Sequence, residues 1–189
     1  DKYDIQAKKA IVQMTGEIEQ IPVPLELRFY GITARDMAPQ RKSISSVIDE
    51  RRKITYLVYP TEEIVVERFV EIMTKLELIA DMEAYGQIDD ILKEQSVSGR
   101  YVISELEEYA QVAPNFRKEK RMDQLRKYRN YPYMRKRWEK YAKHRDRSGE
   151  TWEEVIERIL GFAEPIWQAF CRDEIFLDDW MPELGRFLG

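Results

Sequence analysis

The residues best suited to chemistry in this sequence are basic side chains interleaved with aromatic ones. Between Arg117 and Arg147, fourteen Lys and Arg residues face four acids, a net charge of +10 in a chain whose total is −4. The cations include Arg117, Lys118, Lys120, Arg121, Arg126, Lys127, Arg129, Arg135, Lys136, Arg137, Lys140 and Lys143, and the aromatic residues are Phe116, Tyr128, Tyr131, Tyr133, Trp138 and Tyr141. Cations neutralise phosphates and rings stack on bases, so this pattern is typical of a nucleic-acid interface.

Two interpretations of this basic segment stay open. In the first, it contacts RNA through Arg126, Lys127, Arg129, Arg135, Lys136, Arg137, Lys140 and Tyr131. In the second, it is a solvated basic face that balances the acidic remainder of the chain, and its aromatic residues belong to the core. Trp138 and Tyr141, three residues apart, suit a buried helical stripe in either case.

Other classes of site find little support in the sequence. The single histidine, His144, lies in a charged run, and the single cysteine, Cys171, is distant from it, so no metal-ligand spacing exists. No Gly-rich phosphate loop and no Ser/His/Asp set can be assembled. One cysteine also excludes an internal disulfide framework. With no long apolar run or signal-peptide pattern, we expect a cytoplasmic globular protein without a membrane segment.

The first sixty residues are the β-prone part of the chain. Residues 23–29 alternate apolar and non-apolar side chains, which predicts a strand, and Pro24 favours a sheet edge. Residues 54–59 (ITYLVY) are apolar on both faces and predict a buried strand. The segment 7–19 suits either a helix or a strand, and 31–41 predicts a polar loop.

Helical spacing begins after Pro60. We expect Thr61 to cap a helix whose buried stripe is Val65, Phe69, Ile72, Leu76 and Ile79, with Glu71 and Lys75 paired on its exposed side. Further helices are expected at 82–93, 103–110, 115–129, 133–143 and from 151 onward. The last should begin with a capping box of Thr151 and Glu154, bury Trp152, Val155, Ile159, Phe162, Ile166 and Phe170, and contain Pro165. The order predicts an α+β fold with a helical second part.

Three stretches together resemble the AbiEii/AbiGii nucleotidyltransferase family, which includes toxins of bacterial abortive-infection (phage-defence) and toxin–antitoxin systems. They are residues 58–68 (VYPTEEIVVER), residues 78–88 (LIADMEAYGQI), and residues 133–141 (YMRKRWEKY) followed by 151–156 (TWEEVI) and 162–166 (FAEPI). The resemblance covers about residues 54–170. It implies that residues 1–60 are the remnant of a nucleotidyltransferase-like mixed sheet and that 61–189 form a helical domain, mainly a bundle.

The resemblance also implies site residues. Arg68 stands at the position of the family's catalytic lysine, with Glu67 beside it and Lys75 as a displaced phosphate-binding cation. Asp81 matches the first acid of the second motif only after a shift of three residues, and Glu26 stands for a metal-side carboxylate. Without the resemblance, Glu67 and Arg68 are ordinary salt-bridging residues on a helix surface.

The most important departure from the family concerns the metal site. The family's glycine turn followed by paired Asp residues on a strand is absent, and those carboxylates hold the Mg²⁺ that bridges the NTP and the attacking hydroxyl. We therefore expect them to lie upstream of Asp1 or to have been lost, and no metal to be held by this segment itself.

Two hypotheses follow. In the first, this is part of an enzyme that transfers a nucleotide from an NTP to an RNA acceptor, tRNA above all, or to a protein, and the helical part acts as lid and acceptor-binding surface. A cognate antitoxin is then an expected partner. In the second, it is a catalytically inactive helical module that binds RNA or protein through residues 117–147.

Overall fold

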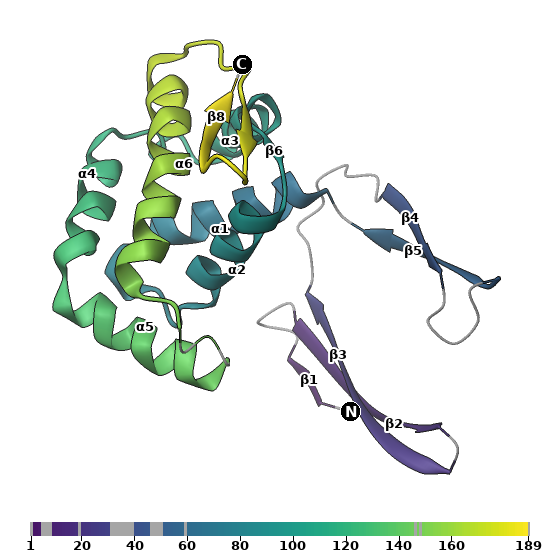
Figure 1. Cartoon of the computed structure of the whole chain (residues 1–189). Helices are drawn as coiled ribbons and strands as arrows, with labels where there is room; N and C mark the ends of the chain where they lie inside the picture. Colours follow the sequence, from purple (N-terminus) through teal and green to yellow (C-terminus); the bar gives the residue numbers. More distant parts are fainter. Residues whose placement is uncertain are drawn as a thin grey trace. The chain divides into compact units, whose positions relative to one another are not determined.

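The protein divides into two compact units, Asp1–Pro39 and Gln40–Gly189, in a computed structural model (Figure 1). The residues that the structure describes are 2–4, 9–18, 20–30, 40–45, 51–58, 60–145, 147 and 149–188. Helices and small antiparallel sheets both occur, which confirms the predicted α+β class. Among these residues, no helix combines the length and apolar character needed to cross a membrane.

The first unit contains an antiparallel sheet of three strands in the order β1 (Lys2–Asp4), β2 (Lys9–Ile18) and β3 (Ile21–Tyr30). Of the segment 7–19, which suited either a helix or a strand, the described residues 9–18 form β2. The predicted strand at 23–29 lies within β3, and β3 is an edge strand, as Pro24 indicated. An edge position suits proline because it lacks the N–H that a second neighbour would require.

The second unit begins with a hairpin of β4 (Gln40–Ser45) and β5 (Lys53–Val58). The prediction of a strand at 54–59 is confirmed for residues 54–58, but the prediction that it is buried is wrong: Ile54 is 52% and Leu57 62% exposed. The reason is that β5 pairs with β4 alone, so these apolar residues have no second layer above them within the described part of the unit. Of the predicted loop at 31–41, residues 31–39 lie outside the described residues and Arg41 belongs to β4.

Helix α1 (Thr61–Lys75) follows Pro60 as the spacing predicts, and a 3₁₀ turn, η1 (Leu76–Leu78), follows it. Val65, Phe69 and Ile72 are buried in it. The prediction that Thr61 caps the helix is wrong. Pro60 holds the cap position and the Thr61 hydroxyl donates to Gln95 Oε1 at 2.7 Å, which ties the helix to the end of the next one instead.

The remaining helices lie at the predicted segments with shifted ends, except that residues 115–119 of the helix predicted at 115–129 are not helical. They are α2 (Glu83–Glu94), α3 (Gly99–Val112), α4 (Lys120–Lys127) with the 3₁₀ turn η2 (Tyr128–Asn130), α5 (Pro132–His144) and α6 (Trp152–Arg172). The capping box of Thr151 and Glu154 is present, and the predicted apolar stripe of α6 is buried throughout. Helix α6 contacts α2, α3, α4 and α5 and is the centre of the bundle (Figure 1).

A small sheet at the C-terminal end was not predicted from the sequence. It has the order β6 (Val97–Ser98), β7 (Asp179–Met181) and β8 (Arg186–Leu188). Its strands are two or three residues long. Such strands carry almost no periodic signal, and the pairing of β6 with β7 joins segments more than eighty residues apart.

The four tryptophans link different segments of the helical unit through hydrogen bonds. Trp138, Trp152, Trp167 and Trp180 are all buried. Each indole N–H donates to a backbone carbonyl of another segment, respectively those of Glu150, Tyr128, Lys118 and Leu92, at 2.9, 2.8, 3.3 and 2.8 Å. Each ring therefore adds apolar burial and also satisfies a carbonyl that packing withdraws from water.

Candidate functional site

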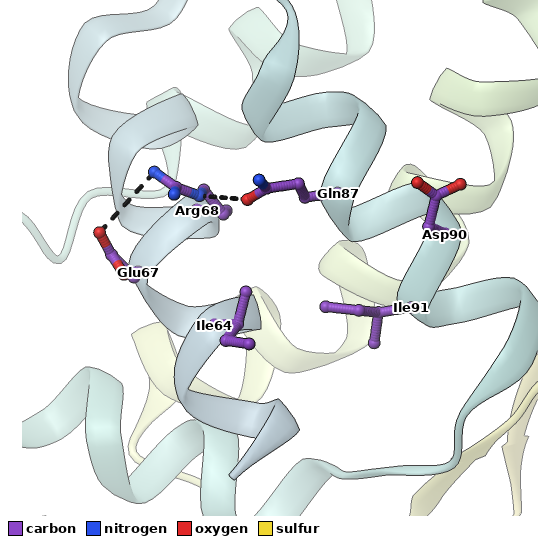
Figure 2. A pocket seen from close by; sticks show the side chains of 6 residues that line it. All are labelled: Ile64, Glu67, Arg68, Gln87, Asp90 and Ile91. Carbon is purple, nitrogen blue, oxygen red and sulfur yellow. Dashed lines mark hydrogen bonds and ion pairs between the residues drawn. The ribbon is translucent and has the colours of Figure 1, made fainter. Parts of the chain in front are cut away.

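Arg68 lies at a pocket between α1 and α2 (Figure 2). The pocket has a volume of about 370 Å³, and its lining is Ile64, Glu67, Arg68, Gln87, Asp90 and Ile91. The Arg68 guanidinium is already bound there: Nε donates to Gln87 Oε1 at 2.6 Å and an Nη atom to Glu71 Oε2 at 3.2 Å. A phosphate would have to compete with these groups for the same donors.

Of the other residues that the family resemblance singles out, Glu67 also lines this pocket, whereas Asp81 and Lys75 do not. The exposed Asp81 accepts the N–H of Glu83 at 2.9 Å, which satisfies a free donor in the first turn of α2. Lys75 pairs with Glu71 at 2.7 Å, as its spacing predicts. Glu26 lies in β3 opposite Gln13, in the other compact unit, and its side chain is outside the described residues. The structure thus places Glu67 and Arg68 together, with Asp81 and Lys75 apart from their pocket.

A second group of charges surrounds Asp89 of α2, whose side chain is fully buried. Its carboxylate accepts hydrogen bonds from Arg147, at 2.8 Å, and from Arg158, and pairs with Lys93 at 3.0 Å. Glu150 pairs with the same Lys93 and Arg147 at 2.6 and 2.7 Å. These contacts hold Arg147 and Glu150 against α2, and the Asp89–Arg158 pair links α2 to α6. We call these five residues and Asp90 the Asp89 cluster.

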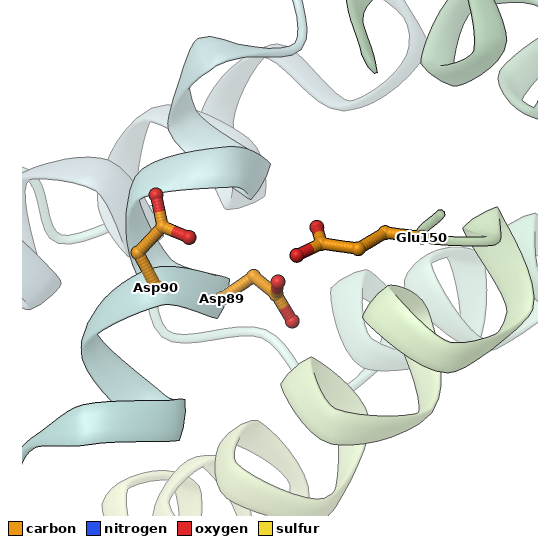
Figure 3. Close-up of side chains that lie close together, drawn as sticks. All are labelled: Asp89, Asp90 and Glu150. Atoms are coloured by element: carbon orange, nitrogen blue, oxygen red, sulfur yellow. The ribbon is translucent and has the colours of Figure 1, made fainter. Parts of the chain in front are cut away.

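Asp89, Asp90 and Glu150 bring their carboxylates close enough together to hold a metal ion by geometry alone (Figure 3). The surrounding cations argue against that role. Arg147, Lys93 and Arg158 already supply three positive charges to these acids. A divalent cation would need to displace them or accept their repulsion, so the residues present do not fit Mg²⁺.

The pKa of Glu150 is lowered by its partners in the Asp89 cluster. Burial by itself raises the pKa of this carboxyl, but hydrogen bonds from Lys93 and Arg147 outweigh burial and hold the pKa below its ordinary value. A carboxyl whose pKa is depressed in the folded state stabilises the fold above its unfolded pKa. That contribution is lost as the pH falls through the folded pKa, so acid weakens this cluster.

Several arginines of the basic segment have partners inside the protein. Arg126, Arg129 and Arg135 each pair with one acid of α6, respectively Glu164, Glu157 and Glu153. Arg137 donates instead to the backbone carbonyls of Glu77 and Ile79. These four residues were expected to contact RNA, but the structure gives each of them a partner inside the protein. The sequence could not identify these partners because they lie eighteen or more residues away in the chain or are backbone atoms.

The lysines of the same segment differ from the arginines. Lys127, Lys136, Lys140 and Lys143 are exposed, and no ion pair links any of them to another described residue. On α5, Tyr133, Lys136, Lys140 and Lys143 recur at steps of three, four and three, so they lie along one face of the helix. We call this row the lysine stripe. The seven steps from Lys136 to Lys143 span ~10 Å along the helix axis, at about 1.5 Å per residue.

The aromatic residues of the segment divide between core and surface. Phe116, Tyr128 and Trp138 are buried, as the second interpretation of the segment expected. Tyr131 and Tyr133 are 38% and 51% exposed. The Tyr131 ring stacks on the Tyr128 ring, with centroids 6.0 Å apart. The centroids of the Tyr131 and Tyr133 rings are 5.9 Å apart. The exposed rings of Tyr131 and Tyr133 thus lie at the N-terminal end of the lysine stripe.

No protein-family model, curated protein sequence or solved structure gives a significant match to this chain. The resemblance to the nucleotidyltransferase family stays a prediction, and the geometry of the described residues carries the functional argument.

Proposed function

We propose that the helical unit is an RNA-binding module whose contact surface is the lysine stripe of α5 together with Lys127. The observation that supports this is that the arginines and the lysines of the basic segment differ in their partners. Acids of α6 neutralise Arg126, Arg129 and Arg135. The lysines of this surface are exposed and have no acidic partner among the described residues. A structural basic face would be expected to pair both kinds.

The chemistry of lysine suits such a surface. An ammonium group on a flexible stem attracts phosphates without a fixed geometry, and the release of counterions from the nucleic acid drives the association. Exposed like charges at i,i+3 and i,i+4 repel one another and destabilise the free helix slightly. A polyanion removes that repulsion when it binds.

The test is charge reversal along the lysine stripe. The triple variant K136E/K140E/K143E should lose at least about tenfold in affinity for total tRNA, measured by fluorescence anisotropy near 50 mM salt. The slope of log affinity against log salt should also become shallower by about 2, because three phosphate contacts are removed at ~0.7 each for single strands. Arg135 and Arg137 are left unchanged because they hold α5 in place.

A matched control uses single reversals of two exposed basic residues. Lys140→Glu lies on the lysine stripe, whereas Arg100→Glu changes the same charge on α3, which does not contact α5 closely. Only the first should weaken binding, and far-ultraviolet circular dichroism should be the same for both. Equal affinity of the triple variant and the unaltered protein would remove the proposal.

Nucleotide transfer is a second proposal, supported by the position of Arg68 at the pocket between α1 and α2. The Asp89 cluster does not fit a metal ion, so we derive no step of transfer from this chain's carboxylates. Incorporation of labelled nucleoside triphosphates into total tRNA with Mg²⁺ tests it. Transfer that Arg68→Ala abolishes would support the proposal, and no transfer from any of the four triphosphates would end it.

A further inference from the structure

Three tyrosines form a continuous row of rings from the core to the solvent. Tyr128 is only 6% exposed, and its backbone carbonyl accepts the indole N–H of Trp152, so its place in the core is fixed. Tyr131 stacks on it with an interplanar angle of 19°, and Tyr133 follows at 53°. The guanidinium of Arg137, held at the carbonyl of Ile79, lies 5.5 Å from the Tyr133 ring centroid.

The row is pre-organised by its neighbours. Pro132 occupies the first position of α5, where its fixed φ suits the start of a helix, and it separates the two exposed rings. Tyr131 is in extended conformation just before the helix, which directs it back toward Tyr128. Rings that are already ordered lose little conformational freedom when a ligand stacks on them. Half of the Tyr133 surface is nevertheless open to solvent.

We infer that this row is a stacking platform for an unpaired base, and that the module selects single-stranded RNA over duplex RNA. The inference rests on the proposed function, because the same face must first attract phosphates. A base stacked at Tyr131 or Tyr133 places its strand at the beginning of the lysine stripe, with Lys136 one helical turn from Tyr133 and Lys140 one turn further.

The physical reason for the selection is access to the base face. In an A-form duplex both faces of each base are covered by neighbouring bases, so a tyrosine ring finds only edges, sugars and phosphates. In a single strand every base exposes a face when it unstacks, and any base can use it. The lysines alone attract both forms, whereas the tyrosines favour the single strand only.

The experiment compares two RNA probes and three proteins by fluorescence anisotropy at constant salt. The probes are a labelled oligouridine and a labelled RNA duplex of the same length, and the proteins are the unaltered chain, Y131L/Y133L and Y131F/Y133F. Leucine removes the rings but keeps apolar side chains, whereas phenylalanine keeps the rings. The Leu variant should lose about tenfold in affinity for the single strand and less than about twofold for the duplex. The Phe variant should retain single-strand binding.

The outcomes separate the two ideas. Tighter binding to the duplex than to the single strand, or equal loss for both probes in the Leu variant, overturns single-strand selection and leaves RNA binding intact. Binding to neither probe overturns both the inference and the proposed function. Loss of single-strand binding in the Phe variant as large as in the Leu variant would overturn stacking as the cause, because the rings are still present there.

Discussion

Replacement of Asp89 by alanine is expected to lower the free energy of unfolding by about 3–5 kcal/mol. The carboxylate is fully buried, and Arg147, Arg158 and Lys93 all pair with it. Its removal leaves Arg158 without its ion-pair partner and leaves Asp90 and Glu150 alone to neutralise Lys93 and Arg147. The Arg147 side chain is only 11% exposed, so water cannot take the place of the acid easily. Urea unfolding followed by tryptophan fluorescence measures the loss, because all four tryptophans are buried.

Asp90→Ala is the matched control, since it removes a carboxylate from the next position of α2. Asp90 pairs with two of the same cations, but its side chain is 55% exposed and its pairs are screened by water. The loss for this variant should stay below about 1 kcal/mol. Equally small losses of unfolding free energy in both variants would show that the Asp89 cluster does not stabilise the fold. A rise in melting temperature with millimolar Mg²⁺ would favour a metal site instead.

The sequence predicted those parts of the fold that depend on neighbours in the chain. The capping box at Thr151 involves residues three apart, and the stripe of α6 is a periodic pattern within one helix, so both were predicted correctly. Thr61 shows the limit of the same reasoning. Its hydroxyl donates to Gln95, thirty-four residues away, and no local rule identifies such a partner. The predicted burial of residues 54–58 was wrong for a similar reason, since burial depends on what covers the strand.

The candidate site also combines features that depend on neighbours in the chain with contacts between distant residues. A basic segment with aromatic residues was visible in the composition, but its separation into paired arginines and unpaired lysines was not. The acids that pair with Arg126 and Arg129 lie on α6, thirty-eight and twenty-eight residues further along. One signal was present in the sequence: Tyr133, Lys136, Lys140 and Lys143 have helical spacing, which distinguishes them from Arg135 and from the buried Trp138. Asp89 carried no such signal, because an acid at i,i+4 from Lys93 usually lies on a surface.

The choice of arginine for the fold and lysine for the surface has a physical basis. A guanidinium offers five donors in a fixed plane and can bind several acids at once, as Arg147 does with Asp89 and Asp90 of α2 and with Glu150. Lysine holds its hydration more strongly and loses more freedom when it is fixed. Arg135 links α5 to Glu153 of α6, and Arg137 links α5 to the carbonyls of Glu77 and Ile79, so these two arginines help to determine where the lysine stripe points. In the proposed function, these arginines position the helix that carries the lysine stripe but do not themselves contact the RNA.

Replacement of Trp180 by alanine is expected to lower the free energy of unfolding by about 3–5 kcal/mol. The ring is fully buried and packs against Phe162 and Phe187, with ring centroids 5.7 and 5.4 Å away. Its indole N–H donates to the carbonyl of Leu92 at the end of α2, and that acceptor would lose its partner. Trp180 also lies opposite Val97 in the pairing of β6 with β7, so the small sheet should loosen as well.

Two further variants separate the causes of that loss. Trp180→Phe keeps an aromatic ring but has no N–H, so it should lose less than the alanine variant, and the remaining loss reports mainly the Leu92 hydrogen bond and the smaller volume. Leu177→Ala changes a 63% exposed residue of the same C-terminal segment and should alter the unfolding free energy by less than about 0.5 kcal/mol. If Trp180→Ala lost no more than Leu177→Ala, the C-terminal sheet would be an appendage of the bundle, because a ring that truly fills its core cannot be removed without leaving a cavity.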